Sequence, residues 1–518
     1  MNLPDLLSGD SHEVALIDRE RRVTYAELDA ESRRVASGLI EVGIREGDRV
    51  ALWLPNNTAW LACFFACAHV GAIALAVNTR FRSGELTDIL GRSGAKALVL
   101  WPGFRGIDFN GILEAVDPAA LSALDVVVAY GEGDETVPVT IAQRRAVAYR
   151  DIARSSALET TRARPDAGVL LFTTSGTTSK PKLVLHDQRS LARHAFDVAR
   201  AFGFDAPDAT ILLPIPLCGT FGLTAALGAI AARRPLVMLP TFDAQSAASL
   251  IRKHAVTHFP AAGDIVAQLL ASSDEPRPYP SVRLVIGART GQAARAERRG
   301  LTLVGVYGMS EVQAMVSRHY ETDPPEKREL GGGQLIATDA RVRARDTATG
   351  RILPHGESGE LEFRMPSAMT GYFGNQEATR AVFTDDGFVA SGDLGYTVEG
   401  GFVFQSRMGD ALRLSGFPVN PLEIEETINA VPGVAASQVV GIDGERGTYA
   451  VAFVVAQAGA VVDEQTVIAH CASRIAGYKA PKRVFTIDAF PVTHSANGTK
   501  VQKGRLRELA VERLRSDG

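Results

Sequence analysis

The sequence predicts a layered α/β protein with a second, smaller α+β domain, and three observations lead to this prediction. Short apolar runs alternate with helical patterns over the first two thirds of the 518 residues. These runs are apolar throughout, as in parallel strands that helices cover on both faces. After about residue 335 the strand-like runs become shorter and turn residues join them. A chain of this length also exceeds what one hydrophobic core usually serves.

The first predicted helix begins after Thr24, a good N-cap residue, and ends at Gly43. Its apolar positions fall on one face at helical spacing. Strand-like runs follow along the chain. They are Val50–Leu54, Ala97–Trp101, Val126–Ala129, Gly168–Thr173, Pro235–Leu239, Val282–Ile286 and Thr302–Val306.

Two apolar segments imitate membrane spans in length, Ala59–Val77 and Ile211–Ala232. Gly71 divides the first segment into a helix and a strand, and Pro214 and Gly219 interrupt the second. We therefore expect buried core segments of a large α/β protein and no integral membrane part.

The region after residue 335 predicts a small antiparallel sheet or barrel that closes the large domain. Its strands are Arg341–Arg345, Glu360–Arg364 and Phe402–Gln405, with a turn over residues 347–350. A polar, glycine-containing segment over residues 406–416 follows. We place the domain boundary there, with a large domain over residues 1–406 and a small one over residues 407–518.

The small domain opens on a well-marked helix. Asn420 is the expected N-cap, Pro421 the first helical residue and Glu423 the third, which together make a capping box. The later elements predict an α+β unit. They are strands at Ser437–Ile442 and Thr448–Ala456, a helix from Asp463 and a strand at Arg483–Ile487.

Composition excludes several classes of function. The 55 basic and 59 acidic residues give a net charge of −4, which argues against a nucleic-acid partner. Cys63, Cys67, Cys218 and Cys471 lack zinc spacing and are expected to be core thiols, as in a reducing cytoplasm. The acidic N-terminal residues are unlike a signal peptide, so we expect a cytoplasmic protein. The oligomeric state stays open, with a homodimer as one candidate.

The run Phe172–Lys182 reads FTTSGTTSKPK and is the most informative feature of the sequence. Hydroxyls, freed backbone N–H groups and ammonium groups suit a polyphosphate. Gly176 is not followed by the Gly-Lys-Ser/Thr of a Walker loop, and no Gly-x-Gly-x-x-Gly follows a predicted strand. Alone, the run also fits a solvated loop. A nucleotide is the first hypothesis, and the other motifs of the chain favour it over a solvated loop.

The loop and five further motifs, in order over nearly the whole chain, resemble those of the adenylate-forming superfamily of acyl-CoA synthetases, luciferases and nonribosomal-peptide adenylation domains. The further motifs are Tyr307-Gly308-Met309-Ser310-Glu311, Gly359-Glu360-Leu361 with Gly371-Tyr372, Ser391-Gly392-Asp393-Leu394-Gly395, Ser406–Arg413 and Asn497-Gly498-Thr499-Lys500. The resemblance implies that ATP activates a carboxylic acid to an acyl-adenylate, which coenzyme A then converts to acyl-CoA.

The resemblance also implies roles for individual residues in binding ATP and Mg²⁺. Lys500, Glu311 and Thr174 are the implied catalytic residues, with Glu311 and Thr174 on the metal. Lys503 is the rival for the role of Lys500. The implied ATP-binding set is Thr174, Ser175, Gly176, Thr177, Thr178, Lys182, Gly287, Ala288, Tyr307, Gly308, Met309, Ser310, Asp393, Arg407 and Lys500. Within it, Tyr307 offers a ring face to adenine and Asp393, in a glycine-bracketed turn, accepts the ribose hydroxyls.

Further implied sites lie outside the ATP-binding set. The hinge for rotation of the small domain is Gly409, and coenzyme A meets Ser415 and Gly416. The acyl group is expected to contact Leu217, Gly219, Phe221, Gly222, Val306 and Gly308. Because Gly219 stands where many acyl-CoA synthetases have a histidine or an aromatic residue, we expect a wide entrance and a bulky or medium-to-long acyl group.

The sequence departs from the superfamily pattern at several positions. Ser179 and Leu183 replace glycines of the loop, and Pro418 replaces an arginine of some relatives. Two alternatives therefore stay open: a ligase that loads a separate carrier protein, and a relative that binds acyl groups or nucleotides without catalysis. The retained Glu311 and Lys500 favour an enzyme.

Overall fold

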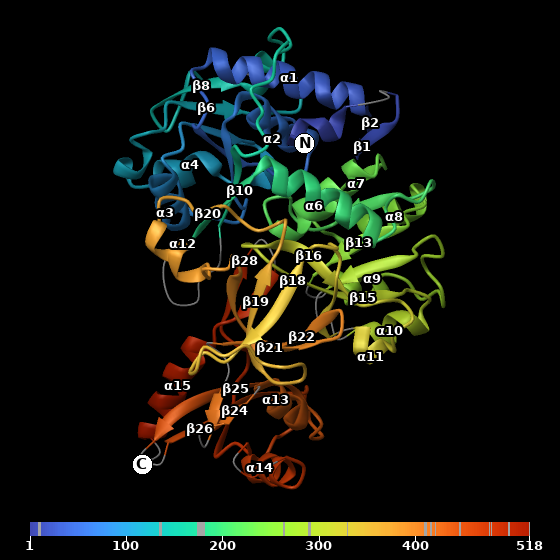
Figure 1. Ribbon diagram of the computed structural model, residues 1–518, viewed down its shortest axis with the longest axis vertical. Coiled ribbons are helices and arrows are strands. Elements are labelled where there is room, and N and C mark those ends of the chain that lie inside the picture. Colours follow the sequence, from blue (N-terminus) through green and yellow to red (C-terminus); the bar gives the residue numbers. More distant parts are fainter. Residues whose placement is uncertain are drawn as a thin grey trace. The chain divides into compact units, whose positions relative to one another are not determined.

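The computed structural model describes residues 1–8, 12–133, 137–173, 182–262, 265–287, 292–328, 330–408, 412–414, 417–419, 421–444, 447–475, 477, 479–495 and 498–516. It divides into two compact units (Figure 1). Unit 1 comprises Met1–Arg341 and Phe363–Val389, and unit 2 comprises Val342–Glu362 and Ala390–Gly518. The boundary at residue 406 stays a prediction.

Unit 1 contains a nine-stranded sheet in the order β20-β10-β9-β4-β3-β5-β6-β8-β7. Its strands are β3 (Arg49–Trp53), β4 (Ile73–Ala76), β5 (Ala97–Leu100), β6 (Val126–Ala129), β7 (Thr140–Ile141), β8 (Arg144–Ala148), β9 (Gly168–Thr173), β10 (Leu183–Asp187) and β20 (Gly371–Tyr372). The strands from β9 to β8 run parallel, whereas β10 and β20 extend the sheet in antiparallel pairs. The apolar runs predicted as parallel strands are thus confirmed.

A second sheet of unit 1 has the order β17-β16-β15-β14-β13-β11-β12-β1-β2. Its strands are β1 (Val14–Asp18), β2 (Arg21–Thr24), β11 (Ile211–Leu213), β12 (Leu236–Met238), β13 (His258–Ala261), β14 (Leu284–Gly287), β15 (Leu303–Met309), β16 (Gln313–Arg318) and β17 (Gly331–Leu335). The strands from β1 to β15 run parallel, and β16 returns antiparallel to β15. The carboxyl ends of the parallel strands therefore meet at one edge, where ligands of such folds bind.

Helices of unit 1 begin where the sequence supplies caps. Thr24 accepts a hydrogen bond from the Glu27 backbone N–H, and Asp187 does the same for Ser190. The helices are α1 (Tyr25–Glu41), α2 (Thr58–Val70), α3 (Ser83–Ser93), α4 (Phe109–Glu114), α5 (Tyr149–Ile152), α6 (Gln188–Ala201), α7 (Thr220–Ala231), α8 (Ala244–Lys253), α9 (Ile265–Ala271), α10 (Ala293–Arg298), α11 (Pro325–Arg328) and α12 (Gln376–Val382). Because α6 packs on β10 and on α7, and α7 packs on β11, β12 and β13, these helices lie between the two sheets (Figure 1).

The two membrane-like segments are core elements. The first forms α2 and β4, and the second forms β11 and α7, as their glycine and proline residues predicted. Every residue of α2 is buried, so its apolar character comes from complete enclosure. No helix within the described ranges is long and apolar enough to cross a membrane.

Unit 2 holds four strands in the order β18-β19-β21-β22, of which β21 and β22 run antiparallel, and an α+β part with its own sheets. The four strands are β18 (Arg341–Arg345), β19 (Gly359–Arg364), β21 (Val389–Val398) and β22 (Gly401–Arg407). The α+β part has strands β23 (Leu412–Leu414), β24 (Phe417–Val419), β25 (Val434–Gly444), β26 (Gly447–Ala456), β27 (Arg483–Thr486), β28 (Val492–Ser495) and β29 (Gly498–Val501), and helices α13 (Pro421–Asn429), α14 (Glu464–Ala472) and α15 (Lys503–Ser516).

The sheet β25-β26-β27 of unit 2 carries apolar packing on both faces. Ile424 and Ile428 of α13 and Val467 of α14 pack in one cluster, while Leu506 and Ala510 of α15 pack in another. The expected α+β domain is therefore confirmed, and Pro421 begins α13 as predicted. The expected N-cap, Asn420, lies outside the described residues.

Candidate active site

Three side chains that are far apart in the sequence meet in unit 1. Glu311 follows the carboxyl end of β15, Lys182 immediately precedes β10, and Tyr372 ends β20. The Tyr372 hydroxyl donates a hydrogen bond of 2.9 Å to Glu311 Oε1. The Lys182 ammonium lies 4.4 Å from the centre of the Tyr372 ring, in cation–π contact. We call these three residues the Lys–Tyr–Glu cluster.

Main-chain hydrogen bonds fix the segment that carries Tyr372. The Met369 N–H donates to the Glu311 carbonyl at 2.7 Å, and the Thr370 N–H donates to the Leu185 carbonyl at 2.8 Å. Phe373 N–H donates to the Leu183 carbonyl at 2.8 Å. The segment Met369–Phe373, the bridging segment, thus joins the residue after β15 to strand β10.

The β15–β16 hairpin holds most of the predicted Tyr307–Glu311 motif. Tyr307 is 7% exposed, and its ring stacks on Phe363 with centres 5.2 Å apart. A nucleotide base could therefore use only the ring face opposite Phe363. A side chain at Gly308 would place its Cβ 2.3 Å from the Ala314 Cα, so the close hairpin explains this glycine. The adenine role of Tyr307 stays a prediction.

Two buried histidines fasten this hairpin to the neighbouring elements. The Nε2 atom of His186, on β10, lies 2.7 Å from the Ser310 carbonyl oxygen. The Nε2 atom of His194, on α6, lies 2.7 Å from the Ala314 carbonyl oxygen. Burial lowers the pKa of each imidazole to about 4. Both rings are therefore neutral near pH 7 and donate through Nε2–H to these carbonyls.

The residues predicted around the acyl group gather at the start of α7. Gly219 is the N-cap of this helix, and Leu217 and Phe221 beside it are buried. A Cβ on Gly222 would lie 2.1 Å from the Pro216 carbonyl oxygen, so only glycine fits there. Thr220 Oγ1 lies 3.4 Å from Ser310 Oγ, which brings this helix start next to the Tyr307–Glu311 motif. Val306, on β15, is also buried.

Unit 2 holds Asp393, the predicted ribose-binding residue, and Arg407 of the predicted ATP-binding set. Asp393 is 2% exposed, and its carboxylate lies 3.0 Å from Arg407, directly across the β21–β22 ladder. The expected glycine-bracketed turn is wrong in one respect, because Asp393 lies within strand β21. Gly392 does adopt a left-handed φ of 67°, and the ladder with β22 begins directly after it, where Asp393 pairs with Arg407.

The two candidate lysines of unit 2 differ in their surroundings. Lys500 lies on β29, where its backbone pairs with Thr493 of β28. Lys503, at the start of α15, places its Nζ 2.9 Å from Glu425 Oε1, and both side chains are largely buried. Lys503 therefore has a structural partner, and the catalytic role of Lys500 stays a prediction.

Several predicted residues lie outside the described residues, and their roles stay predictions. They are Thr174, Ser175, Gly176, Thr177, Thr178, Ala288, Gly409, Ser415 and Gly416. Of the same set of predictions, Gly287 is described and ends β14, at the same strand-end edge as Glu311.

The residues present fit a magnesium ion bound together with a nucleotide. Mg²⁺ prefers oxygen ligands and is commonly held by one or two carboxylates, water and substrate phosphates. Glu311 supplies one carboxylate at the carboxyl edge of the sheet. No group of three or more His, Cys, Asp or Glu side chains among the described residues could hold a metal alone. Phosphate oxygens would therefore complete the site.

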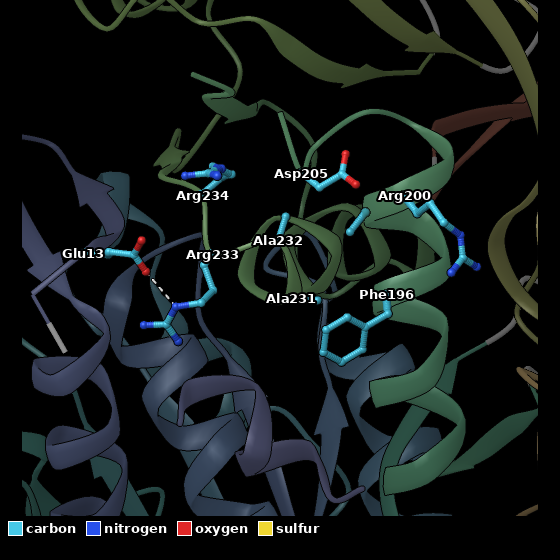
Figure 2. Close-up of a pocket in the computed structure, with 9 residues that line it drawn as sticks. Glu13, Phe196, Arg200, Asp205, Ala231, Ala232, Arg233 and Arg234 are labelled. Carbon is cyan, nitrogen blue, oxygen red and sulfur yellow. Dashed lines mark hydrogen bonds and ion pairs between the residues drawn. The ribbon is translucent and has the colours of Figure 1, made fainter. Parts of the chain in front are cut away.

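A separate cavity of about 470 Å³ lies near the amino ends of strands β1 and β12 (Figure 2). Ala231 and Ala232 at the end of α7 line it, just before β12 begins. Arg233 at its wall forms an ion pair of 2.7 Å with Glu13, drawn dashed in Figure 2, and thereby ties the chain near β1 to α7. This cavity belongs to the amino ends of the strands, opposite to Glu311.

A parallel α/β fold with a glutamate, a lysine and a small-residue helix start at the carboxyl edge of its sheet is typical of enzymes that bind a nucleotide beside a second substrate. Comparison with known proteins gives the particular family. The chain belongs to the AMP-binding enzyme family of adenylate-forming proteins, because the family model matches residues 8–373 and the model of the AMP-binding enzyme C-terminal domain matches residues 423–497.

Similar proteins agree with this family. The chain is 33% identical over 515 residues to the 3-[(3aS,4S,7aS)-7a-methyl-1,5-dioxo-octahydro-1H-inden-4-yl]propanoyl:CoA ligase of Mycobacterium tuberculosis, which covers 96% of this chain and 95% of the relative. It is 30% identical over 496 residues to the long-chain-fatty-acid–CoA ligase FadD13 of the same species, covering 94% and 93%. The crystal structure of ATP-bound MatB from Rhodopseudomonas palustris superposes with a TM-score of 0.83 at 27% identity, covering 98% and 99%.

These matches confirm the predicted reaction class. The chain is an AMP-forming acid–CoA ligase: it activates a carboxylic acid with ATP and transfers the acyl group to coenzyme A. Sequence reasoning assigned no role to Tyr372 beyond a motif match, and none to His186. The polar side chain of His186 within the otherwise apolar run that became β10 was the signal that could have singled it out.

Proposed function

We propose that the acid activated by this enzyme is bulky or of medium to long chain. The observation that carries the proposal is the start of α7, where Gly219 stands between the buried Leu217 and Phe221 and directly precedes Thr220, which contacts Ser310. A glycine at this position leaves room that a larger side chain would fill, and the surrounding walls are apolar. The name of the relative at 33% identity describes a fused two-ring propanoyl group, and that of FadD13 a long chain.

In the proposed adenylation step, the carboxylate attacks the α-phosphorus of ATP and pyrophosphate leaves, giving the acyl-adenylate. This step needs little proton transfer, so positioning and charge neutralisation contribute most of the catalysis. Lys182 and the hydroxyls of residues 174–178 would hold the β- and γ-phosphates. Glu311, with Thr174, would hold Mg²⁺, which neutralises the developing phosphate charge when bound. Lys500 would neutralise the α-phosphate and the attacking carboxylate.

The two remaining parts of the ATP site follow the same proposal. Arg407 and Asp393 form a ready-made pair for the ribose, because the guanidinium holds the carboxylate in place across the β-ladder. Gly409 would serve as the hinge of a small domain over residues 407–518, and Ser415 and Gly416 would contact coenzyme A. A cytoplasmic location and a homodimer complete the proposal.

A panel of carboxylic acids tests the substrate class. With ATP, Mg²⁺ and coenzyme A, we expect AMP release with kcat/KM about 100-fold higher for ring-bearing or long-chain acids than for acetate, because each buried methylene adds about tenfold discrimination. Gly219→His is the matched variant, and its φ of −98° suits any residue. It should lower kcat/KM for the bulky acids and spare acetate. Preference of the wild type for acetate would contradict the proposal.

The same assay separates the acceptor alternatives. Release of AMP that depends on a phosphopantetheinyl carrier protein, and not on coenzyme A, would identify a carrier-loading ligase. If no acid of the panel supports exchange of labelled pyrophosphate into ATP, the substrate lies outside the proposed class of acids.

A further inference from the structure

We propose that Tyr372 is a positioning residue for ATP binding, which fixes the magnesium carboxylate and the phosphate-binding lysine relative to each other before the nucleotide arrives. The inference rests on the proposed roles of Glu311 and Lys182. Tyr372 itself contacts neither phosphate nor metal in this account. It acts through its two neighbours, by its hydroxyl on one side and its ring on the other.

The first part of the argument is the hydroxyl. Tyr372 is 6% exposed, so its O–H bond to Glu311 Oε1 forms in a largely dry environment, where a hydrogen bond to a charged group is strong. This bond restricts rotation of the carboxylate and leaves Glu311 orientated toward the site. A carboxylate that is already orientated loses less conformational entropy when it takes up a metal ion.

The second part is the ring. The Lys182 ammonium at 4.4 Å from the ring centre gains cation–π attraction, which limits the rotamers of a long, flexible side chain. Lys182 is the last residue of the predicted phosphate loop over residues 172–182. Because the ring holds this lysine, the ammonium is kept beside the place where the loop would present the phosphates.

The third part is the backbone that supports Tyr372. The bridging segment bonds the Glu311 carbonyl at one end and strand β10 along its length, with Val184 opposite Tyr372 in the ladder. Gly371, with a φ of 152°, lies against Thr379, where a Cβ would come within 2.8 Å of a methyl group. The Tyr372 N–H also donates to Thr379 Oγ1 at 2.9 Å. The tyrosine is therefore held by its own strand, independently of the side chains that it orientates.

Two substitutions separate the two contacts. Tyr372→Phe removes only the hydroxyl, and Tyr372→Leu removes the ring as well. We would measure ATP binding to the full-length enzyme by calorimetry over a series of Mg²⁺ concentrations, without any acid, so that the readout does not depend on turnover. The matched control is Tyr25→Phe, which removes a buried hydroxyl that donates to the Ile230 carbonyl elsewhere in unit 1.

We expect Tyr372→Phe to raise the Mg²⁺ concentration for half-maximal ATP binding about 5-fold, the cost of ordering one side chain that the hydroxyl no longer holds. Tyr25→Phe should leave it unchanged. Tyr372→Leu should in addition weaken ATP binding at saturating Mg²⁺ by about 5-fold. In a Glu311→Gln background, Tyr372→Phe should add no further shift, because the hydroxyl acts through Glu311.

Other outcomes overturn the inference. The first is a Tyr372→Phe variant whose ATP binding depends on Mg²⁺ as in the wild type. The second is a shift in the half-maximal Mg²⁺ concentration that persists in the Glu311→Gln background. The third is tighter ATP binding by Tyr372→Leu at saturating Mg²⁺, which would mean that the ring holds Lys182 away from phosphate. Failure of the proposed function looks different, since the wild type itself would then show no acid-dependent exchange of pyrophosphate into ATP.

Discussion

Lys500 and Lys503 show how much the surroundings of a residue add to its sequence. Both are lysines close to the end of the chain, and spacing after an Asn-Gly pair alone favoured Lys500. The structure pairs Lys503 with Glu425, whose carboxylate also accepts the Val439 N–H at 2.9 Å. The sequence around Lys503 could not reveal this buried, hydrogen-bonded ion pair, because Glu425 lies far away along the chain.

Alanine substitution should separate the two lysines cleanly. Lys503→Ala leaves the Glu425 carboxylate buried without its cation, so we expect a loss of about 3–5 kcal/mol in the free energy of unfolding, measured by urea titration. The folded fraction should keep its adenylation rate. Lys500→Ala should unfold like the wild type, lose acid-dependent pyrophosphate exchange and still form thioester from supplied acyl-adenylate. The reverse pattern would exchange the two assignments.

Among the secondary-structure elements, the sequence best predicts those that are determined by a local pattern, such as an apolar run or a helix cap. The runs proposed as β6 and β9 have their observed bounds, and α1 starts at its predicted cap. The sequence did not predict β10 as a strand, because β10 contains a histidine and is not one of the wholly apolar runs that predicted parallel strands. The contact of His186 with Ser310 joins residues 124 positions apart, and no periodicity reports on such a pair.

The same reasoning explains which parts of the site were predictable. Glu311 and Lys182 were found because motif spacing fixes them. Their link through Tyr372 depends on the bridging segment, whose hydrogen bonds join β15 to β10 only in the folded chain. The sequence therefore predicted Glu311 and Lys182 as site residues, but neither the part of Tyr372 nor the geometry of the Lys–Tyr–Glu cluster.

The histidines that fasten the β15–β16 hairpin should make stability depend on pH. His186 and His194 have pKa values of about 4 in the folded protein, against about 6.5 when unfolded. Between these values the unfolded chain binds protons that the folded protein does not. The free energy of unfolding should therefore fall as pH decreases from about 6.5 to about 4, by up to about 1.4 kcal/mol per pH unit for each histidine.

Thermal unfolding at several pH values tests this dependence. His194→Gln keeps a donor for the Ala314 carbonyl and removes one titrating group, so its melting temperature should fall less steeply between pH 6.5 and 5 than that of the wild type. An equal slope in both proteins would show that His194 does not titrate on unfolding.

At the scale of the whole molecule, each of the four cysteines is buried. Burial raises the pKa of Cys67 and of Cys218 to about 12 and that of Cys471 to about 11, and it raises the pKa of Cys63 as well. Thiols react as thiolates, so these groups should be inert in the native state. We expect fewer than one thiol to react with Ellman's reagent at pH 7.5 in the native protein, and all four in urea. Rapid native reaction of any of them would contradict this burial.

Because its native thiols are expected to be unreactive, the wild-type protein could be labelled at introduced cysteines without first replacing the native ones. Val139 in unit 1 and Val461 in unit 2 are 83% and 96% exposed, so cysteines introduced there would be the accessible ones. A pair of spin labels at these two positions could report, in solution, the distances between the units with no ligand, with ATP and with acyl-adenylate plus coenzyme A. Because the four native cysteines are buried, such labels would measure directly whether the small domain rotates between the two half-reactions, as predicted.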